Sequence, residues 1–318
     1  MGSRRGIAVF LAALILGVTI SYALPRFIPR FSLTKRVALL ELSGVISYGD
    51  SASLLGGGRI TPDGVREMVD IVRSDPSYAA VVLVINSPGG SAAASEEIYG
   101  ILSGLSRDLP VVAYIGEYGA SGGYYVALAA DEIVASPAAL TGSVGAVSIL
   151  LNYAGLAEKL GVKGETFKSG ELKDVGNPWR EMTAGERALM QSLIDSSAEL
   201  FRQRVWEVRG DKIRDWEGVI TARPYTGTQA LEVGLVDRVG TLEDAVNLAR
   251  RMAGLPEDAP AEWVRPPTPG LLDLLLGGTP SGVRGVKLSY ELLWMWPLPY
   301  GLEELAVGPS RLAALVGG

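Results

Sequence analysis

A serine flanked by glycines is the residue of this sequence best placed to act as a nucleophile. The segment Gly119-Ala120-Ser121-Gly122-Gly123 fits the pattern G-x-S-x-G, in which glycines permit a sharp turn from a strand into a helix that exposes the serine. Hydrolases with this pattern pair the serine with a histidine, but the 318 residues include no His and no Cys. Taken alone, Ser121 is therefore either a helix N-cap or a nucleophile with another kind of base.

The two missing residue types exclude several kinds of chemistry. Without Cys there is no disulfide framework, no thiolate nucleophile and no iron–sulfur or zinc-finger site. Without His there is no imidazole metal site and no imidazole proton shuttle. Any acid–base step must use Lys, Asp, Glu or Tyr, and we expect neither a metal nor a cofactor.

A lysine that is made neutral by its surroundings is the remaining candidate for the base. An exposed Lys has a pKa near 10.4, so burial beside the serine must lower that pKa by about three units, at a cost of about 4 kcal/mol. Four of the seven lysines fall within fifteen residues: Lys159, Lys163, Lys168 and Lys173. Lys173 lies in the polar stretch Ser169-Gly170-Glu171-Leu172-Lys173-Asp174, and for each of the four the ordinary role is a solvated surface charge.

Two further glycine-rich turns could assist a nucleophile. Asn86-Ser87-Pro88-Gly89-Gly90 follows an apolar strand and precedes a helix, so its backbone N–H groups could face an oxygen anion, although an ordinary loop would have the same pattern. Leu140-Thr141-Gly142-Ser143-Val144-Gly145 is a turn with two hydroxyls that is uninformative by itself.

Strand-like and helix-like segments alternate between residues 36 and 254. Strands are predicted at 36–42, 79–86, 111–115 and 132–135, and the second is apolar enough to be buried on both faces. Helices are predicted after three N-caps: Thr61, Thr183 with a capping box that leads to a helix reaching Val208, and Thr241 with a helix ending near Gly254. This alternation predicts an α/β fold with a largely parallel sheet.

An uncharged run of 18 residues near the N-terminus predicts a membrane anchor. Residues 7–24 would span about 27 Å as a helix, close to the thickness of a bilayer core. We favour a retained anchor over a signal peptide cleaved near Ser21-Tyr22-Ala23. Residues 1–6 form a basic flank and 25–35 a linker, and the flanking charges alone slightly favour a cytoplasmic body.

The remaining charge and the C-terminal segment bear on the partners. Six basic residues precede the first acid, Glu41, so the rest of the chain carries a net charge of −12, which argues against a nucleic-acid partner.

Residues 36–254 are predicted to form the enzymatic domain, and 255–318 a Pro-rich linker and an aromatic-rich extension. The stretch 288–300 could dock on its own domain, on a neighbour or on a membrane; we favour membrane or subunit contact.

Five motifs in one order resemble those of the signal peptide peptidase A family of Ser-Lys serine proteases. They are the strand with its NSPGG turn, the ASGGYY segment, the TGSVG turn, the KSGxxKD stretch followed by REMT, and the YTGTQALEVGLVD segment at 225–237. The resemblance covers about residues 37–253. It implies the Clp-protease/crotonase fold, a parallel-sheet spiral of β-β-α units, in the short form that carries one copy of the motifs.

The resemblance also implies roles for individual residues. Ser121 would attack the peptide carbonyl, and Lys173 would accept the hydroxyl proton and later protonate the leaving amine. The N–H of Gly90 would bind the oxyanion, with the N–H of Gly122 as a second donor because it directly follows the nucleophile. Ser143 would orient Lys173.

The resemblance further implies that the chain is a single-pass membrane protein with its catalytic domain outside the cytoplasm. It also implies assembly as a ring- or dome-shaped homo-oligomer. The expected substrates are remnant signal peptides or other membrane-associated peptides, and the site would be completed within or between identical subunits. One alternative is a related protease specific for a membrane-scaffold protein. An alternative of another class is a crotonase-fold acyl-CoA hydratase or isomerase, which would need a carboxylate base and a coenzyme A site, and a third is an inactive scaffold.

Overall fold

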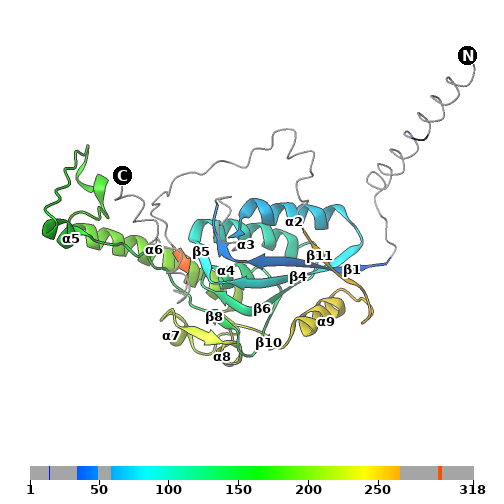
Figure 1. Ribbon diagram of the computed structural model, residues 1–318. Coiled ribbons are helices and arrows are strands. Elements are labelled where there is room, and N and C mark those ends of the chain that lie inside the picture. The colour runs from blue at the N-terminus through cyan, green and yellow to red at the C-terminus, as the bar shows by residue number, and fades with distance from the viewer. Residues whose placement is uncertain (1–13, 15–33, 49–58, 266–292, 296–318) are drawn as a thin grey trace, which may run out of the picture.

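The central feature of the molecule is a largely parallel sheet with helices on both faces (Figure 1). The computed structural model describes Leu14 and residues 34–48, 59–265 and 293–295. Its main sheet has the order β10-β7-β6-β4-β1-β11, and β8 pairs with both β6 and β9. The strands are β1 (Arg36–Ser43), β4 (Tyr78–Ser87), β6 (Val111–Ala120), β7 (Glu132–Ala135), β8 (Leu140–Gly142), β9 (Pro224–Thr226), β10 (Arg238–Val239) and β11 (Ala261–Val264). All of these pairings are parallel except β8 with β9, so the predicted α/β class is confirmed.

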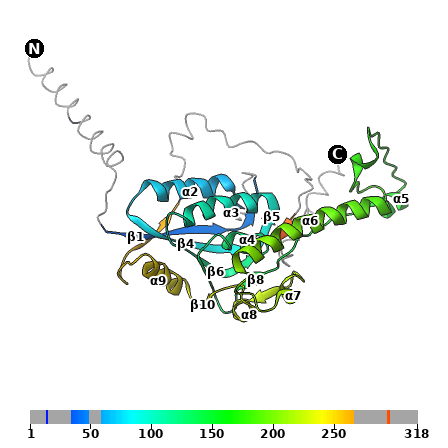
Figure 2. The same ribbon diagram turned by 180° about the vertical axis from the view of Figure 1, so that it is seen from behind.

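The central strands are buried on both faces because two separate helical layers cover them. Along β4, Val81 and Leu83 point into a core shared with α2 and α3, whereas Ala80 and Val82 point into a second core under α9. Figures 1 and 2 show α2 and α3 on one face of the sheet and α9 on the other. The continuous apolar run in the sequence therefore reflects two cores rather than one.

Helix starts follow the capping signals in the sequence. The Thr61 hydroxyl accepts from the N–H of Gly64 at 3.1 Å, and full capping boxes join Thr183 to Glu186 and Thr241 to Asp244. The longer helices are α2 (Pro62–Ser74), α3 (Ala92–Ser106), α6 (Ala184–Arg209) and α9 (Leu242–Met252). The shorter ones are α4 (Gly122–Ala127), α5 (Ala154–Lys159), η1 (Glu171–Asp174, a 3₁₀ turn), α7 (Trp216–Val219) and α8 (Gly227–Val233).

A second, small sheet lies beside the main one. It contains β2 (Val45–Ile46), β3 (Arg59–Ile60), β5 (Gly89–Ser91) and β12 (Leu293–Met295), in the order β12-β5-β2-β3. β12 comes from the C-terminal extension and pairs antiparallel with β5. These three residues of the extension therefore pair with a strand of their own domain.

The main sheet extends past the boundary predicted at residue 254. β11 pairs in parallel with β1 along the edge of the sheet, with Val37 opposite Ala261 and Leu40 opposite Val264. The predicted anchor at 7–24 lies outside the described residues except for Leu14. Within the part of the chain that the structure describes, no helix is both long and apolar enough to span a bilayer.

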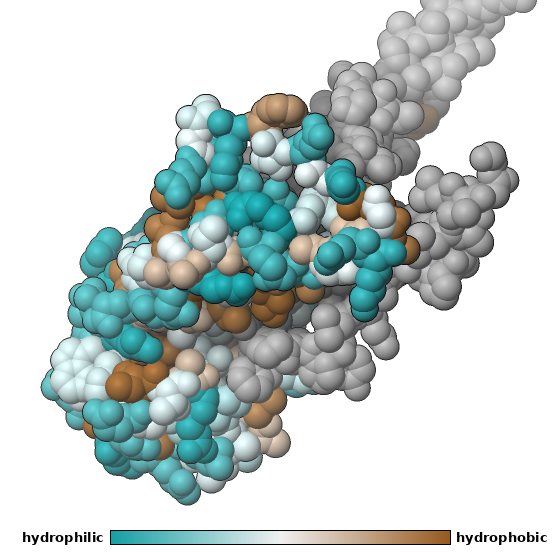
Figure 3. Space-filling model, turned by 90° about the vertical axis from the view of Figure 1, so that its left-hand side faces the viewer, coloured by the Kyte–Doolittle hydropathy of each residue, from teal (hydrophilic) through white to brown (hydrophobic). Residues whose placement is uncertain are grey.

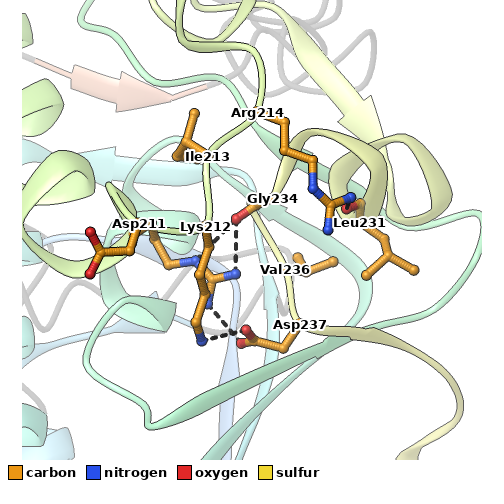
Figure 4. A pocket seen from close by; sticks show the side chains of 9 residues that line it. Asp211, Lys212, Ile213, Arg214, Leu231, Gly234, Val236 and Asp237 are labelled. Carbon is orange, nitrogen blue, oxygen red and sulfur yellow. Dashed lines mark hydrogen bonds and ion pairs between the residues drawn. The ribbon is translucent and has the colours of Figure 1, made fainter.

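A buried ion pair fixes the inner end of α6 (Figure 4). Arg209, only 3% exposed, donates to Asp237 at 2.7 Å and to the carbonyl of Gly234 at 2.9 Å, while the exposed Lys212 reaches the other oxygen of Asp237 at 2.6 Å. Burial acts to raise the pKa of Asp237, but the hydrogen bonds from Arg209 and Lys212 outweigh it, so the pKa lies below its usual range. The carboxylate is therefore charged and paired.

Replacing Arg209 should destabilise the fold much more than replacing Lys212. Arg209→Met leaves a buried carboxylate with one exposed partner, and we expect a loss of about 3 kcal/mol in the free energy of unfolding. Lys212→Met removes a half-exposed partner, for which we expect about 1 kcal/mol or less. Denaturant unfolding measures both values, and equal losses would show that the buried pair does not hold this end of α6.

Candidate active site

Ser121 occupies a strained turn between β6 and α4. Its backbone has φ 54° and ψ −121°, a region that residues with a side chain rarely adopt, and it is only 1% exposed. Its side chain makes no capping hydrogen bond, although it stands at the N-cap position. Such strain persists only where the surroundings impose it, and it is concentrated at functional sites. The structure therefore favours a nucleophile turn over an ordinary cap.

Neighbouring glycines allow this turn to pack closely against the end of β4. A Cβ on Gly123 would lie 2.6 Å from the carbonyl oxygen of Ser87, and one on Gly119 would lie 2.7 Å from the side chain of Ile115. Any larger residue at either position would push the turn away from β4 or from the core. The G-x-S-x-G spacing is thus explained by packing on both sides of Ser121.

The turn lies where β6 changes its partner. The first half of β6 pairs with β7, and its last three residues pair with β8, so that Ala120 is opposite Gly142. The N–H of Ser121 donates to the carbonyl of Gly142 at 2.8 Å. The next residue, Ser143, also has a positive φ of 53°, and its N–H donates to the carbonyl of Arg223 at 3.1 Å. Ser121 and Ser143 therefore each directly follow the end of one of two adjacent paired strands.

The two predicted oxyanion donors lie in α4 and in the strand β5 that contacts it. Gly90 is in β5, which contacts α4, and a Cβ on it would overlap the carbonyl oxygen of Ile46 in β2. Gly122 is the first residue of α4, where N–H groups have no acceptor within the helix. Gly122 therefore directly follows the serine, and Gly90 lies in a strand that contacts α4 and has no room for a side chain.

The backbone of β12 runs along the edge of β5 that faces away from β2. Trp294 is opposite Gly90, Leu293 is opposite Ser91, and β12 also contacts α4. An extended segment therefore already lies antiparallel to the strand that contains the predicted oxyanion donor. No sequence signal pointed to this pairing, because three residues of irregular sequence do not specify a partner strand.

Lys173 lies in a different part of the molecule. It belongs to η1, within the segment 146–182, which we call the arm and which lies with α5 at the outer end of α6, away from α4 (Figures 1 and 2). Asp174 is ion-paired through Arg180 to Glu186 in the first turn of α6. α6 contacts α4 through Phe201, fifteen residues further on, or about 22 Å along the helix axis. The chain does not bring its own Lys173 to its own Ser121.

A charged cluster holds η1 to the helix. The guanidinium of Arg180 binds Asp174 at 2.9 Å and Glu186 at 2.6 Å, and Lys168 binds Asp174 at 2.6 Å. The hydrogen bonds from Arg180 lower the pKa of Glu186 to about 2, and those from Arg180 and Lys168 lower the pKa of Asp174. Carboxylates with lowered pKa values contribute stability above about pH 4 that is lost as the pH falls toward 2, so the arm is held at neutral pH. No motif in the sequence indicates this cluster.

The arm exposes an unusual number of large apolar side chains. Those more than a third exposed are Val147, Ile149, Leu151, Tyr153, Leu156, Leu160, Val162, Phe167, Leu172 and Trp179. Phe167 is 93% exposed. Figure 3 views the molecule from this end and shows apolar side chains between hydrophilic ones at the surface. Such a surface is typical of a contact with another chain.

No candidate metal centre lies near these residues. Among the residues that the structure describes, no group of three or more acidic side chains is arranged to hold a metal ion. The chemistry available at the turn is that of a serine hydroxyl, two glycine amides and a second serine.

Comparisons with known proteins agree with the motifs. A family model described as Peptidase family S49 matches residues 104–256. A protein of Synechocystis sp. named as a protease is 36% identical over 248 residues, covering 78% of this chain and 85% of the relative. One of Enterococcus faecium named as signal peptide peptidase SppA is 31% identical over 256 residues, covering 80% and 74%. The chloroplastic serine protease SPPA of Arabidopsis thaliana is 32% identical over 284 residues, covering 89% of this chain and 41% of the relative.

Substituting Gly123 should disturb the turn, whereas a distant helical glycine tolerates the same change. Gly123→Ala places a methyl group against the backbone of Ser87, and we expect a loss of about 2 kcal/mol in unfolding free energy. Gly100 in α3 has open space around it, so Gly100→Ala should stabilise by about 0.5–1 kcal/mol. Thermal or urea unfolding compares the two; a neutral Gly123→Ala would contradict the close packing.

Removing Arg180 should free the arm without unfolding the core. In Arg180→Ala, amide hydrogen exchange across 168–178 should accelerate about ten-fold or more, while exchange in β4 and β6 stays unchanged. Arg187→Ala is the matched control, since its pair with Glu181 at 3.3 Å is exposed on both sides. Equal exchange in the two variants would mean that the Arg180 cluster does not hold the arm.

Proposed function

The chain belongs to peptidase family S49 and is a serine protease, and we propose that it is an endopeptidase with a Ser121–Lys173 dyad. The observation that carries the proposal is the strained, buried turn at Ser121, which has no capping role, is followed directly by Gly122, and leads into α4, the helix that β5 contacts. A carboxylate base and a coenzyme A site, which an acyl-CoA hydratase would need, have no support in the family match.

The proposed reaction begins with attack of Ser121 Oγ on the peptide carbonyl. Neutral Lys173 accepts the hydroxyl proton and passes it to the leaving amine, and water then hydrolyses the acyl-enzyme by the same route in reverse. The N–H groups of Gly90 and Gly122 stabilise the oxyanion, and the Ser143 hydroxyl orients the lysine.

We assign the lysine to a neighbouring copy of the chain. Within one copy, Lys173 is anchored to the outer end of α6, far from the turn that contains Ser121. The apolar surface of the arm needs a partner, and a second copy supplies both the cover and an acceptor site for Lys173. A head-to-tail contact of this kind, repeated around an axis, closes into a ring.

The proposal also covers the fold and the location of the enzyme. The fold is the Clp-protease-like spiral of β-β-α units. Residues 7–24 form an anchor in the lipid bilayer, and the catalytic domain lies outside the cytoplasm. The relative named as a signal peptide peptidase supports signal peptides or other membrane-associated peptides as substrates. A peptide would bind by adding an extended strand to the edge of β5, as β12 does.

The dyad and its division between copies can be tested together. Ser121→Ala and Lys173→Ala should each abolish peptide hydrolysis. Co-assembly of the two inactive variants should restore activity, in random mixing at about a quarter of the sites, because a site can then take serine from one copy and lysine from its neighbour. Full activity of either variant alone would exclude the dyad, and no recovery on co-assembly would place both residues in one copy.

Removing β12 should open the edge of β5. Deletion of residues 285–318 should raise kcat/KM for an extended peptide several-fold, mainly through a lower KM, because substrate no longer competes with the tail. Deletion of 300–318 retains β12 and is the control. An unchanged kcat/KM would contradict the competition, and unchanged oligomer size and liposome binding would separately exclude membrane or subunit contact by this segment.

A further inference from the structure

The side chain of Tyr125 ties the nucleophile turn to two other helices. Its N–H donates to the carbonyl of Ser121 at 2.9 Å, which closes the first turn of α4 directly after the strained residue. The tyrosine is completely buried, and its hydroxyl donates to the carboxylate of Glu96 in α3. Any restraint on Tyr125 is therefore passed to the backbone of Ser121.

Arg204 of α6 completes this contact. Its Nε donates to the Tyr125 hydroxyl at 3.3 Å, and its Nη2 donates to Glu96 at 3.1 Å. Its guanidinium also lies 4.5 Å over the ring of Tyr99 in α3. One cation thus contacts a hydroxyl, a carboxylate and an aromatic ring, a combination that a planar guanidinium allows and a lysine does not.

Aromatic packing restrains the ring of Tyr125 from both helices. Tyr99 and Phe201 meet it edge-on, with ring centroids 5.5 Å and 5.0 Å away. Burial and the bond to Glu96 raise the pKa of Tyr125, so the hydroxyl remains a proton donor. These contacts restrict the movement of the Tyr125 side chain, and they therefore also restrict the backbone of α4 to which it is attached.

The adjacent Tyr124 provides an internal comparison. It is also completely buried in α4, but its hydroxyl donates to the carbonyl of Leu235 at 2.7 Å, on the side away from the Glu96 and Arg204 contacts. Each tyrosine therefore has one buried hydroxyl that acts as a donor, and that of Tyr125 is the one hydrogen-bonded to side chains of α3 and α6.

We propose that Arg204 and Glu96 are positioning residues for the Ser121 nucleophile, acting through the Tyr125 hydroxyl. A residue at φ 54° is held there only by surrounding contacts, and the first turn of α4 is the element through which helices α3 and α6 impose it. Loss of the hydroxyl allows the turn to relax, which moves Oγ away from the position for attack. This inference rests on the proposed function, in which Ser121 is the nucleophile.

The test compares Tyr125→Phe with Tyr124→Phe in the full-length protein. We measure the rate of Ser121 labelling by a fluorophosphonate probe, together with kcat, KM and the unfolding midpoint. Tyr124→Phe loses one buried hydrogen bond and Tyr125→Phe loses two, so both midpoints should fall, and that of Tyr125→Phe by more. Labelling and kcat should fall about ten-fold in Tyr125→Phe with little change in KM, and stay near wild type in Tyr124→Phe.

Two further variants, Arg204→Lys and Arg204→Met, distinguish a positioning role from a general loss of folding. Arg204→Lys retains a positive charge beside Glu96 but cannot also stack and reach the hydroxyl, so its labelling rate should be intermediate between wild type and Arg204→Met. Equal labelling rates in Tyr125→Phe and Tyr124→Phe would overturn this inference and leave the proposed function standing. A wild-type protein that the probe does not label at Ser121 would overturn both.

Discussion

The backbone strain at Ser121 is the constraint around which the rest of the domain is arranged. A serine at φ 54° and ψ −121° costs on the order of 1–3 kcal/mol, which neighbouring contacts must offset. β8 contributes the carbonyl of Gly142, β4 provides the surface against which Gly123 packs, and α4 closes its first turn on the serine carbonyl. Each of these contacts needs a small residue or a buried strand in a fixed register, so the parallel sheet serves mainly to hold one turn.

The long helix α6 separates two kinds of structure. Its inner half packs in the core, where Phe201 meets Tyr125 and Arg209 is paired with Asp237. Its outer end carries the arm through charged contacts of Arg180, with apolar side chains left uncovered. The same helix is therefore a core element at one end and a support for an exposed apolar surface at the other. Short-range packing fixes the first role, whereas the second depends on what covers the arm.

Much of the fold follows from the sequence because its signals are local. β4 is apolar over its full length, and Thr183 with Glu186 predicts the start of α6 correctly. The sequence predicts β6 only to residue 115 because Gly116 and Gly119 weaken the strand pattern, but the strand continues to Ala120, since β8 pairs with residues 118–120. The conformation of Ser121 could not be predicted, since a capping serine and a strained one have the same glycine-rich sequence. The pairing of β12 depends on a contact between distant segments, which no local pattern encodes.

The distance between the arm and the nucleophile turn has a consequence for the life of the protein. Under the proposed division of the dyad between copies, a newly synthesised copy folds with its lysine held at the far end of α6 and would have no hydrolytic activity. Peptide-bond cleavage would then begin only where copies accumulate beside one another, and dilution would silence it without any inhibitor. A cell that makes such a protease is protected during synthesis by geometry alone, since the first copy has no neighbour.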